Sequence, residues 1–393
     1  MIERKEIQDI VEDYRPRLFK RFRRTKFSIA IFGSHSALEL GMAAKAHKIR
    51  TVLIAQKGRD KVYKRNKHLY DKIITLNNFK NILEPRIQKK LRKKRCILVP
   101  NRSFSVYVEY KGIENDFRVP IYGNRYLLRA EDRKDEKGQY HILEKSGVRI
   151  PKKFEKPEDI DRLSIVKVQQ YGNEQERAFF FAKDYKDYKK EAGGRLKKKI
   201  ITEEDLKNAR IEEVVLGARF NANFHFYGLK DVFGDFDFMG TSDREQVNLQ
   251  GFLNLPAKDQ LKITDVPILN EEIGHKGKTV RESKQPFFYD AAEKLYYSEI
   301  LKKEYPPGHI GPIGIQGAIR YNPEKLAENK KELEFVVFDL SLRIPGDPSM
   351  GPTSPEMRNL SLKYGRKIED PLDLVVMELE YAAKNNRLAE IVT

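Results

Sequence analysis

Four residues near the N-terminus have the composition of a phosphate-binding loop. An apolar run at 27–32 is followed by Gly33-Ser34-His35-Ser36 and then by a helical pattern. Glycine lets a ligand approach the backbone closely, and the free N–H groups at the start of a helix favour an anion. The serines and the histidine add hydrogen-bond donors. We expect an anion site here, although a plain helix cap explains Ser36 equally well.

Two basic loops follow other apolar runs. Asn101-Arg102-Ser103-Phe104 comes after CILVP, and Lys57-Gly58-Arg59 comes after TVLIA. Because the carboxyl ends of parallel strands share one edge of a sheet, we expect Arg102 and Ser103 to meet the same anion as His35. Ordinary turn chemistry explains each loop as well when it is taken alone. The chain has no complete GxGxxG, which argues against a dinucleotide site.

A lysine and an acidic pair occur in predicted strands in the middle of the chain. Lys167 stands among β-branched residues, where a nearby phosphate or an exposed sheet edge would explain it. Glu212 and Glu213 lead into Val214 and Val215. Such a segment can bind an adenine amino group and ribose hydroxyls, or it can be only a strand.

Three polar residues in the last third of the chain suit phosphoryl transfer. Gln316 and Asp339 lie in predicted strands and offer the oxygen ligands that Mg²⁺ prefers. Arg343 follows Asp339 by four residues, so an extended strand would point both side chains to one face. A carboxylate that can bind a metal, beside a guanidinium that can bind a phosphate, is a combination that phosphoryl transfer uses. The alternative is an ion pair on the surface.

The elements that must hold these residues begin with an open α/β domain. Apolar runs alternate with helical patterns over the first 125 residues, which predicts a parallel sheet with helices near 37–48 and 82–94. The predicted strands cover 27–32, 51–55, 72–76, 96–100 and 119–122.

From about residue 126 the pattern changes to α+β. Residues 126–160 are charged and predicted to be mostly helical, with Pro151 ending the helical stretch, and a closing helix is expected over 372–387. Strands are predicted at 164–169, 178–182, 211–215, 219–228 and 334–343, with more β structure in 231–246.

The composition indicates a folded protein with an anionic partner. Lys and Arg number 76 against 58 Asp and Glu, a net charge of +18. Nucleic acid and phosphorylated small molecules are both candidate partners, while the basic runs resemble solvated helix faces. The single cysteine, Cys96, is a candidate nucleophile or a buried strand residue. Without a long apolar run or a secretory pattern, we expect a cytoplasmic protein and no membrane.

Taken in order along the chain, these segments resemble one family. It is the archaeal formate-dependent ligase that makes 5-formamidoimidazole-4-carboxamide ribonucleotide (FAICAR) from the amine AICAR, the PurP type of the ATP-grasp superfamily. The segments that carry the resemblance include GSHS at 33–36, VPNRSF at 99–104, VPIYGNRYLLRAE at 119–131, VKV at 166–168, IEEVVLG at 211–217, RES at 281–283 and FDLSLRI at 338–344.

The resemblance implies an ATP-grasp fold and an ATP-dependent carbon–nitrogen ligase of purine (IMP) biosynthesis. The implied domains are a Rossmann-like preATP-grasp domain at 1–125, a small ATP-grasp subdomain at 126–230 and a large one at 231–393. The implied small-molecule partners are AICAR, formate and ATP; we expect no nucleic-acid partner and a homo-oligomer. The implied residues are Gly33, Ser34, His35, Ser103 and Arg281 for the substrate, Lys167, Glu212, Glu213, Val214 and Val215 for ATP, Gln316 and Asp339 for Mg²⁺ or Mn²⁺, and Arg343 and His35 for catalysis.

Two departures mark a divergent member of this family. The loop 169–177 contains one glycine, where the family has a glycine-rich loop able to cover ATP phosphates. Asp339 replaces the family's metal-binding glutamate and is one methylene shorter. Two alternatives therefore stay open: a paralogous ligase with another acid or amine, and a nucleotide- or nucleic-acid-binding protein that has lost the ligase activity.

Overall fold

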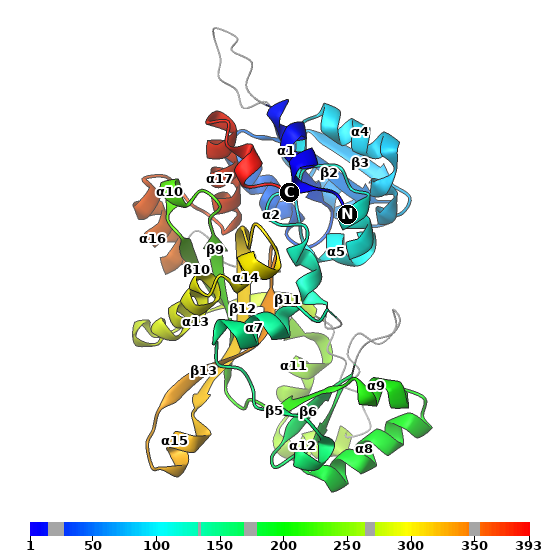
Figure 1. Cartoon of the computed structure of the whole chain (residues 1–393), viewed down its shortest axis with the longest axis vertical. Helices are drawn as coiled ribbons and strands as arrows, with labels where there is room; N and C mark the ends of the chain where they lie inside the picture. The colour runs from blue at the N-terminus through cyan, green and yellow to red at the C-terminus, as the bar shows by residue number, and fades with distance from the viewer. Residues whose placement is uncertain (15–26, 133–134, 169–178, 264–271, 346–353) are drawn as a thin grey trace.

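The computed structural model describes the chain except for residues 15–26, 133–134, 169–178, 264–271 and 346–353. Within the described residues the strands form one parallel sheet and two antiparallel sheets. The parallel sheet lies at one end of the molecule, a five-stranded sheet lies in the middle and a small four-stranded sheet lies at the other end (Figure 1). No helix in the described part combines the length and apolar character needed to cross a bilayer.

The parallel sheet confirms four of the five strands predicted for the N-terminal domain. Its order is β3-β2-β1-β4, and β1 pairs in parallel with both β2 and β4. The fifth predicted strand, 119–122, is wrong as a strand, since Ile121 and Tyr122 form only isolated bridges to Leu98 and Val392. The strands are β1 (Ser28–Phe32), β2 (Arg50–Gln56), β3 (Lys72–Leu76) and β4 (Cys96–Val99).

Helices cover the parallel sheet because each buries one apolar side against it. Ile87 and Leu91 of the basic helix α4 are buried, and Pro85 starts that helix at a position where no N–H is needed. The elements of this region are α1 (Arg4–Glu12), α2 (Ala37–Ala46), α3 (Lys61–Arg65), η1 (Lys67–Leu69), η2 (Phe79–Leu83), α4 (Pro85–Lys93), α5 (Arg102–Val108), α6 (Tyr110–Asn115) and η3 (Leu127–Glu131).

The small antiparallel sheet has the order β5-β8-β6-β7 and carries helix α8 on one face. Its first strand, β5, pairs with β8 and begins after Pro151, the residue at which the predicted helical stretch ends. The elements are α7 (Gln139–Ser146), β5 (Lys153–Phe154), η4 (Pro157–Asp159), β6 (Ser164–Lys167), β7 (Phe179–Ala182), α8 (Tyr185–Lys197), α9 (Glu203–Lys207) and β8 (Arg210–Glu213).

The five-stranded sheet has the order β11-β10-β9-β12-β13. Strand β9 is at its centre, so the predicted domain boundary at 230 falls after a strand that belongs to this sheet; we place the boundary at 214–217 instead. The elements are β9 (Ala218–Phe226), α10 (Lys230–Phe233), β10 (Phe236–Gln246), α11 (Val247–Leu253), α12 (Ala257–Gln260), η5 (Leu261–Ile263), β11 (Glu272–Lys278), η6 (Glu282–Lys284), α13 (Pro286–Tyr297), α14 (Ile300–Glu304), β12 (Gly311–Tyr321), α15 (Pro323–Ala327) and β13 (Leu333–Ser341).

The C-terminus returns to the N-terminal domain and fixes it to the five-stranded sheet. Helix α17 packs beside α2 (Figure 1). The buried carboxylate of Glu378 on α17 accepts hydrogen bonds from Tyr122 Oη at 2.5 Å and from the Gly228 peptide at 2.8 Å. These bonds join three parts of the chain. The last elements are α16 (Pro355–Tyr364), α17 (Leu372–Lys384) and η7 (Leu388–Glu390).

Candidate nucleotide and metal site

The loop after β1 is held in place by its neighbours β2 and β4. The Gly33 peptide donates to Ile54 O at 2.7 Å, and a Cβ on Gly33 would lie only 2.8 Å from that oxygen. Asn101, at the end of β4, donates through Nδ2 to Phe32 O at 3.1 Å and to His35 O at 3.0 Å. Glycine is therefore required here for close packing, and one asparagine sets the shape of the loop.

Two hydroxyls that the sequence predicts to meet one phosphate do lie together. Ser34 Oγ and Ser103 Oγ are 2.5 Å apart at the carboxyl edge of the parallel sheet. Ser36 has a φ of 59° and its side chain makes no capping hydrogen bond, so the alternative of a plain helix cap is wrong for this residue. The paired hydroxyls of Ser34 and Ser103, beside the start of α2, are suitable donors for a phosphate group.

His35 points from this loop toward the edge strand of the five-stranded sheet. Its Nε2 lies 3.9 Å from Glu272 Oε1, and its ring centroid lies 6.0 Å from that of His275 on the same strand, β11. Burial and then the positive charge of Arg343 lower the pKa of His35 to about 4. The imidazole is therefore neutral at pH 7 and acts as a hydrogen-bonding group rather than a cation.

The two predicted metal ligands are cross-strand neighbours. Gln316 on β12 is paired with Asp339 on β13, and the register shifts beside that pair. Such a bulge re-aims the side chain next to it. Arg244 on β10 reaches across, with Nη2 at 2.5 Å from Gln316 Oε1 and 4.0 Å from Asp339 Oδ2, while its Nε lies 3.1 Å from Glu272.

This donor set fits a hard divalent cation that takes its other ligands from phosphate and water. An amide oxygen and a carboxylate are the types of ligand that Mg²⁺ accepts, and Mg²⁺ is commonly held by only one or two protein carboxylates. No group of three His, Cys, Asp or Glu that could hold a metal occurs among the described residues. Arg244 would have to release Gln316 for both oxygens to face a cation.

Arg343 lies just beyond the end of β13 and is held against the N-terminal domain. The predicted continuous strand to residue 343 is wrong, because β13 ends at Ser341. Glu131 accepts the Leu342 peptide N–H at 2.8 Å and lies 3.3 Å from Arg343 Nε. The same carboxylate pairs with Arg102 at 3.1 Å. One buried carboxylate thus fixes two guanidinium groups beside the predicted metal ligands.

The predicted ATP residues form two ion-pair clusters on the small sheet. Lys167 Nζ donates to Glu212, which also accepts from Arg210 Nε at 2.9 Å. Strand β6, which carries Lys167, lies between β8 and β7, so an exposed sheet edge does not explain this lysine. Both carboxylates of the acidic pair are almost fully buried, with 2% and 3% of each side chain exposed.

The second carboxylate of that pair ties the small sheet to the large one. Glu213 accepts two hydrogen bonds from Arg320 on β12, at 2.7 and 3.1 Å. Val214 donates its peptide N–H to Leu163 O at 2.9 Å, and with Val215 it begins the link between the two sheets. Arg320 and Gln316 are four residues apart on β12 and share a face, about 13 Å from each other at ~3.3 Å per residue.

Two predictions lie away from this cluster or outside the described residues. Arg281 is exposed at the start of η6, and among the described residues no hydrogen bond or ion pair joins its side chain to the cluster. The loop 169–177 lies outside the described residues. Cys96 is fully buried on β4 and burial raises the pKa of its thiol to about 12, so it is not a nucleophile.

Four polar residues of the site were not predicted from the sequence. Arg244, Glu272 and His275 lie in strands with many charges, where they look like ordinary surface residues. Glu131 stands at the end of a segment that carries the family resemblance, which is the signal that would have found it. The other three become visible only when β10 and β11 are placed next to the loop of His35.

Comparisons with known proteins find relatives that match nearly the whole chain. Two family models match the chain. The model described as a protein of unknown function (DUF1246) matches residues 29–154, and the model described as a domain of unknown function (DUF1297) matches residues 187–393. A 5-formaminoimidazole-4-carboxamide-1-(beta)-D-ribofuranosyl 5'-monophosphate synthetase of Methanocaldococcus jannaschii is 36% identical over 89% of this chain and 92% of its own length. The protein of the same name from Methanothermobacter thermautotrophicus is 32% identical over 100% of this chain and 99% of its own.

Solved structures confirm the predicted ATP-grasp fold. The IMP biosynthesis protein PurP of Thermococcus kodakaraensis has a TM-score of 0.64 at 20% identity, covering 93% of this chain and 100% of its own. An ADP complex of N5-carboxyaminoimidazole ribonucleotide synthetase has a TM-score of 0.52 at 11% identity, covering 83% and 73%. Biotin carboxylase of Campylobacter jejuni, solved with an ATP analogue, has a TM-score of 0.53 at 10% identity, covering 93% and 71%.

Proposed function

The chain belongs to the family of 5-formaminoimidazole-4-carboxamide-1-(beta)-D-ribofuranosyl 5'-monophosphate synthetases, and we propose that it uses ATP to join formate to the 5-amino group of AICAR. The products are FAICAR, ADP and phosphate. The ATP γ-phosphoryl group passes to formate and gives formyl phosphate. The amine then attacks the formyl carbon, phosphate leaves and the amine nitrogen loses a proton.

One observation carries this proposal: a series of side-chain contacts leads from His35, next to the serines, through Glu272 and Arg244 to the predicted metal ligand Gln316. Ser34 and Ser103 form a paired donor site for the monophosphate of AICAR. His35 follows directly in the chain and lies within 3.9 Å of Glu272, which itself contacts Arg244 beside the metal ligands. A nucleotide held by its phosphate at the serines would thus extend toward the phosphoryl-transfer groups.

The roles of the other residues follow from their positions. Lys167, Glu212 and Glu213 lie on the small sheet, and Val214–Val215 lead from it to the large sheet; we assign ATP to this junction. Gln316 and Asp339 would hold Mg²⁺, which supplies charge neutralisation on the phosphates. Mn²⁺ would use the same ligands. Arg343, fixed by Glu131, is placed to stabilise charge on the transferring phosphoryl group.

The catalysis that these residues support is alignment and charge neutralisation. Neutral His35 can accept or donate a hydrogen bond at the substrate without carrying charge into the site. The buried Cys96 plays no part, so no covalent enzyme intermediate is required. A cytoplasmic location, a homo-oligomer and a substrate role for Arg281 stay predictions.

The test is ADP release, measured with formate and AICAR together and with each alone in the presence of Mg²⁺. The proposal predicts ADP formation only when both are present. ADP formation with AICAR and another carboxylic acid, but not with formate, would contradict it and support a paralogous ligase. The same reactions with Mn²⁺ in place of Mg²⁺ define which metal the site uses.

A further inference from the structure

The positive charge of the chain is concentrated in one part of the N-terminal domain. Residues 45–95 contain 18 lysines and arginines but only three acidic residues, an excess of 15 positive charges in a chain whose net charge is +18. Acidic and basic residues therefore nearly balance in the remainder. Positive charge gathered on one part of a fold is the electrostatic footprint of an anionic partner.

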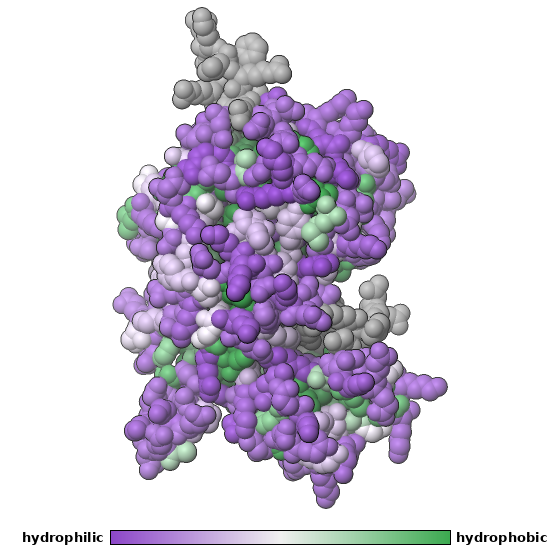
Figure 2. Space-filling model, viewed as in Figure 1, coloured by the Kyte–Doolittle hydropathy of each residue, from purple (hydrophilic) through white to green (hydrophobic). Residues whose placement is uncertain are grey.

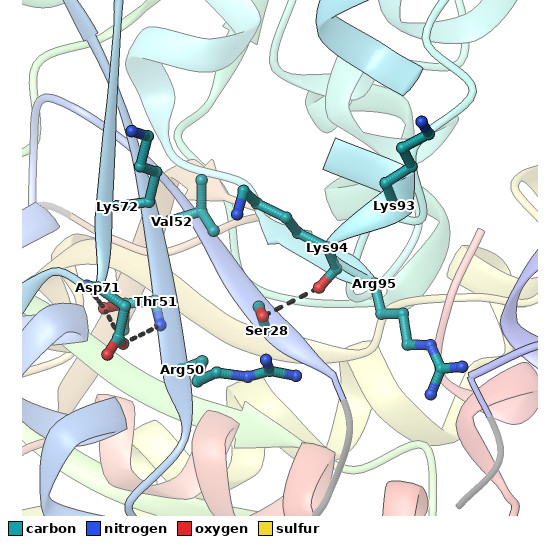
Figure 3. Close-up of a pocket in the computed structure, with 9 residues that line it drawn as sticks. All are labelled: Ser28, Arg50, Thr51, Val52, Asp71, Lys72, Lys93, Lys94 and Arg95. Atoms are coloured by element: carbon teal, nitrogen blue, oxygen red, sulfur yellow. Dashed lines mark hydrogen bonds between the residues drawn. The ribbon is translucent and has the colours of Figure 1, made fainter. Parts of the chain in front are cut away.

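Part of this segment lines a hollow at the amino edge of the parallel sheet (Figure 3), while its residues 57–67 follow β2 at the opposite edge. Ser28, Arg50 and Lys72 begin β1, β2 and β3, so the hollow lies at the edge opposite to the one that carries Ser34 and Ser103. The proposed ligase reaction does not use it. The lining residues are Ser28, Arg50, Thr51, Val52, Asp71, Lys72, Lys93, Lys94 and Arg95.

Five basic residues line this hollow. Asp71 is the single acidic residue in the lining, and it already accepts hydrogen bonds from Lys45 Nζ at 2.7 Å and from the Thr51 peptide at 2.8 Å. Among the described residues, no carboxylate pairs with Lys72, Lys93 or Lys94.

One nitrogen atom of the Arg95 side chain also lacks a partner. Its Nη1 is buried and has no hydrogen-bond partner. The residue itself has a φ of 55°, a left-handed conformation at the end of α4 that glycine or asparagine adopts at lower cost. The same backbone conformation occurs at Lys199, so it marks the end of a helix, and the contribution of Arg95 to the hollow is its positive charge.

The charge continues from the hollow along the outer face of α4. Arg86, Lys89 and Lys90 are exposed on that helix, while its apolar residues Ile87 and Leu91 are buried. The surface is too long for one small anion, and its helix keeps no apolar side chain exposed for insertion into a bilayer. The face seen in Figure 2 is likewise mostly hydrophilic over this domain.

We propose that the hollow and the outer face of α4 form a binding surface for the phosphate backbone of a nucleic acid. The ligand chemistry is a chain of evenly spaced phosphates, which both RNA and DNA supply. Contacts of this kind release counterions, so the affinity must fall steeply with salt. The proposal departs from the sequence-based expectation of no nucleic-acid partner and is independent of the ligase reaction.

The test uses the full-length chain and a matched pair of charge-reversal variants. Helix α8 of the small sheet ends at Lys197, and Lys198 and Lys199 follow it as Lys94 and Arg95 follow Lys93 of α4: the second residue after the helix has a φ of 54° after α8 and 55° after α4. Lys93→Glu/Lys94→Glu and Lys197→Glu/Lys198→Glu thus change the net charge equally. Fluorescence anisotropy with a labelled 20-nucleotide single-stranded RNA and with duplex DNA of the same sequence measures binding at several KCl concentrations.

We expect the α4 variant to lose about tenfold in affinity and to have a shallower dependence on salt, because two phosphate contacts are removed. The α8 variant should stay within about twofold of the unchanged chain. The nucleic acid bound more tightly identifies the source of the phosphates. Equal losses in both variants would show a net-charge effect and overturn the proposal, as would no binding of either nucleic acid at low salt. ADP release by the α4 variant should stay unchanged, which separates the surface from the ligase site.

Discussion

The two edges of the parallel sheet differ in how their basic residues are paired with carboxylates. At the carboxyl edge, Glu131 binds Arg102 and Arg343, and Glu272 binds Arg244. At the amino edge, the lysines at the end of α4 have no carboxylate partner among the described residues. Guanidinium groups held by carboxylates are fixed in place, which suits a reaction that needs exact geometry. Unpaired lysines on a solvated face suit a long, mobile polyanion.

The largest expected effect tests the chemistry assigned to the carboxyl edge. Asp339→Ala removes the carboxylate of the proposed metal site, so ADP release should fall by about 10³-fold or more. AICAR should still bind, because its phosphate is assigned to the serine loop on another domain. Isothermal titration with AICAR measures this; loss of AICAR binding together with turnover would contradict the division between the two parts of the site.

A smaller effect is expected where a carboxylate joins the two antiparallel sheets. Glu213→Gln removes one of the two carboxylates that pair with the buried Arg320, the other being Glu334, and weakening hydrogen bonds to a charged group costs about 1.5–3 kcal/mol. The free energy of unfolding, measured by urea denaturation, should fall by roughly that amount. Lys152→Gln, which removes one charge from an exposed pair with Asp161, is the control and should change it by less than about 1 kcal/mol.

Ser103→Ala tests the phosphate loop itself. The hydroxyl lies 2.5 Å from that of Ser34, and losing one hydrogen bond to a charged group costs about 1.5–3 kcal/mol. We therefore expect the KM for AICAR to rise about tenfold or more while the KM for ATP stays the same. A rise in the KM for ATP alone would contradict the assignment of the AICAR monophosphate to this loop.

The smallest expected effect is a pH dependence of stability. The pKa of His35 is lowered to about 4 in the folded chain from an ordinary value of 6.5. The unfolded chain therefore binds more protons between these values, and stability falls as the pH decreases from 6.5 toward 4. His35→Gln should make the melting temperature less dependent on pH in that window. An unchanged slope would show that His35 is not neutral in the folded protein.

The sequence predicts the parts of this fold that depend on local patterns. The strands that carry the phosphate loop, and the meeting of Ser34 with Ser103, follow from apolar periodicity and the shared edge of parallel strands. The ATP-grasp fold follows from the order of family segments along the chain.

The rest depends on contacts that no local pattern records. Glu272 meets His35 across 237 positions of sequence, and Glu213 meets Arg320 across 107. Strand β9 is predicted correctly, but its membership of the large sheet is a matter of pairing with β10 and β12. The excess of basic residues near the amino edge can be counted in the sequence. That some of them share one surface becomes clear only when the first residues of β1, β2 and β3 are placed side by side.

The most direct test of the ligase assignment follows the formyl carbon itself. Carbon-13 NMR of a reaction that contains ¹³C-labelled formate, ATP, AICAR and Mg²⁺ should show a new formamide resonance that grows with ADP. The resonance should be missing when ATP is left out or when Asp339→Ala replaces the unchanged chain. Hydrolysis of ATP with no transfer of the labelled carbon to AICAR would contradict the account.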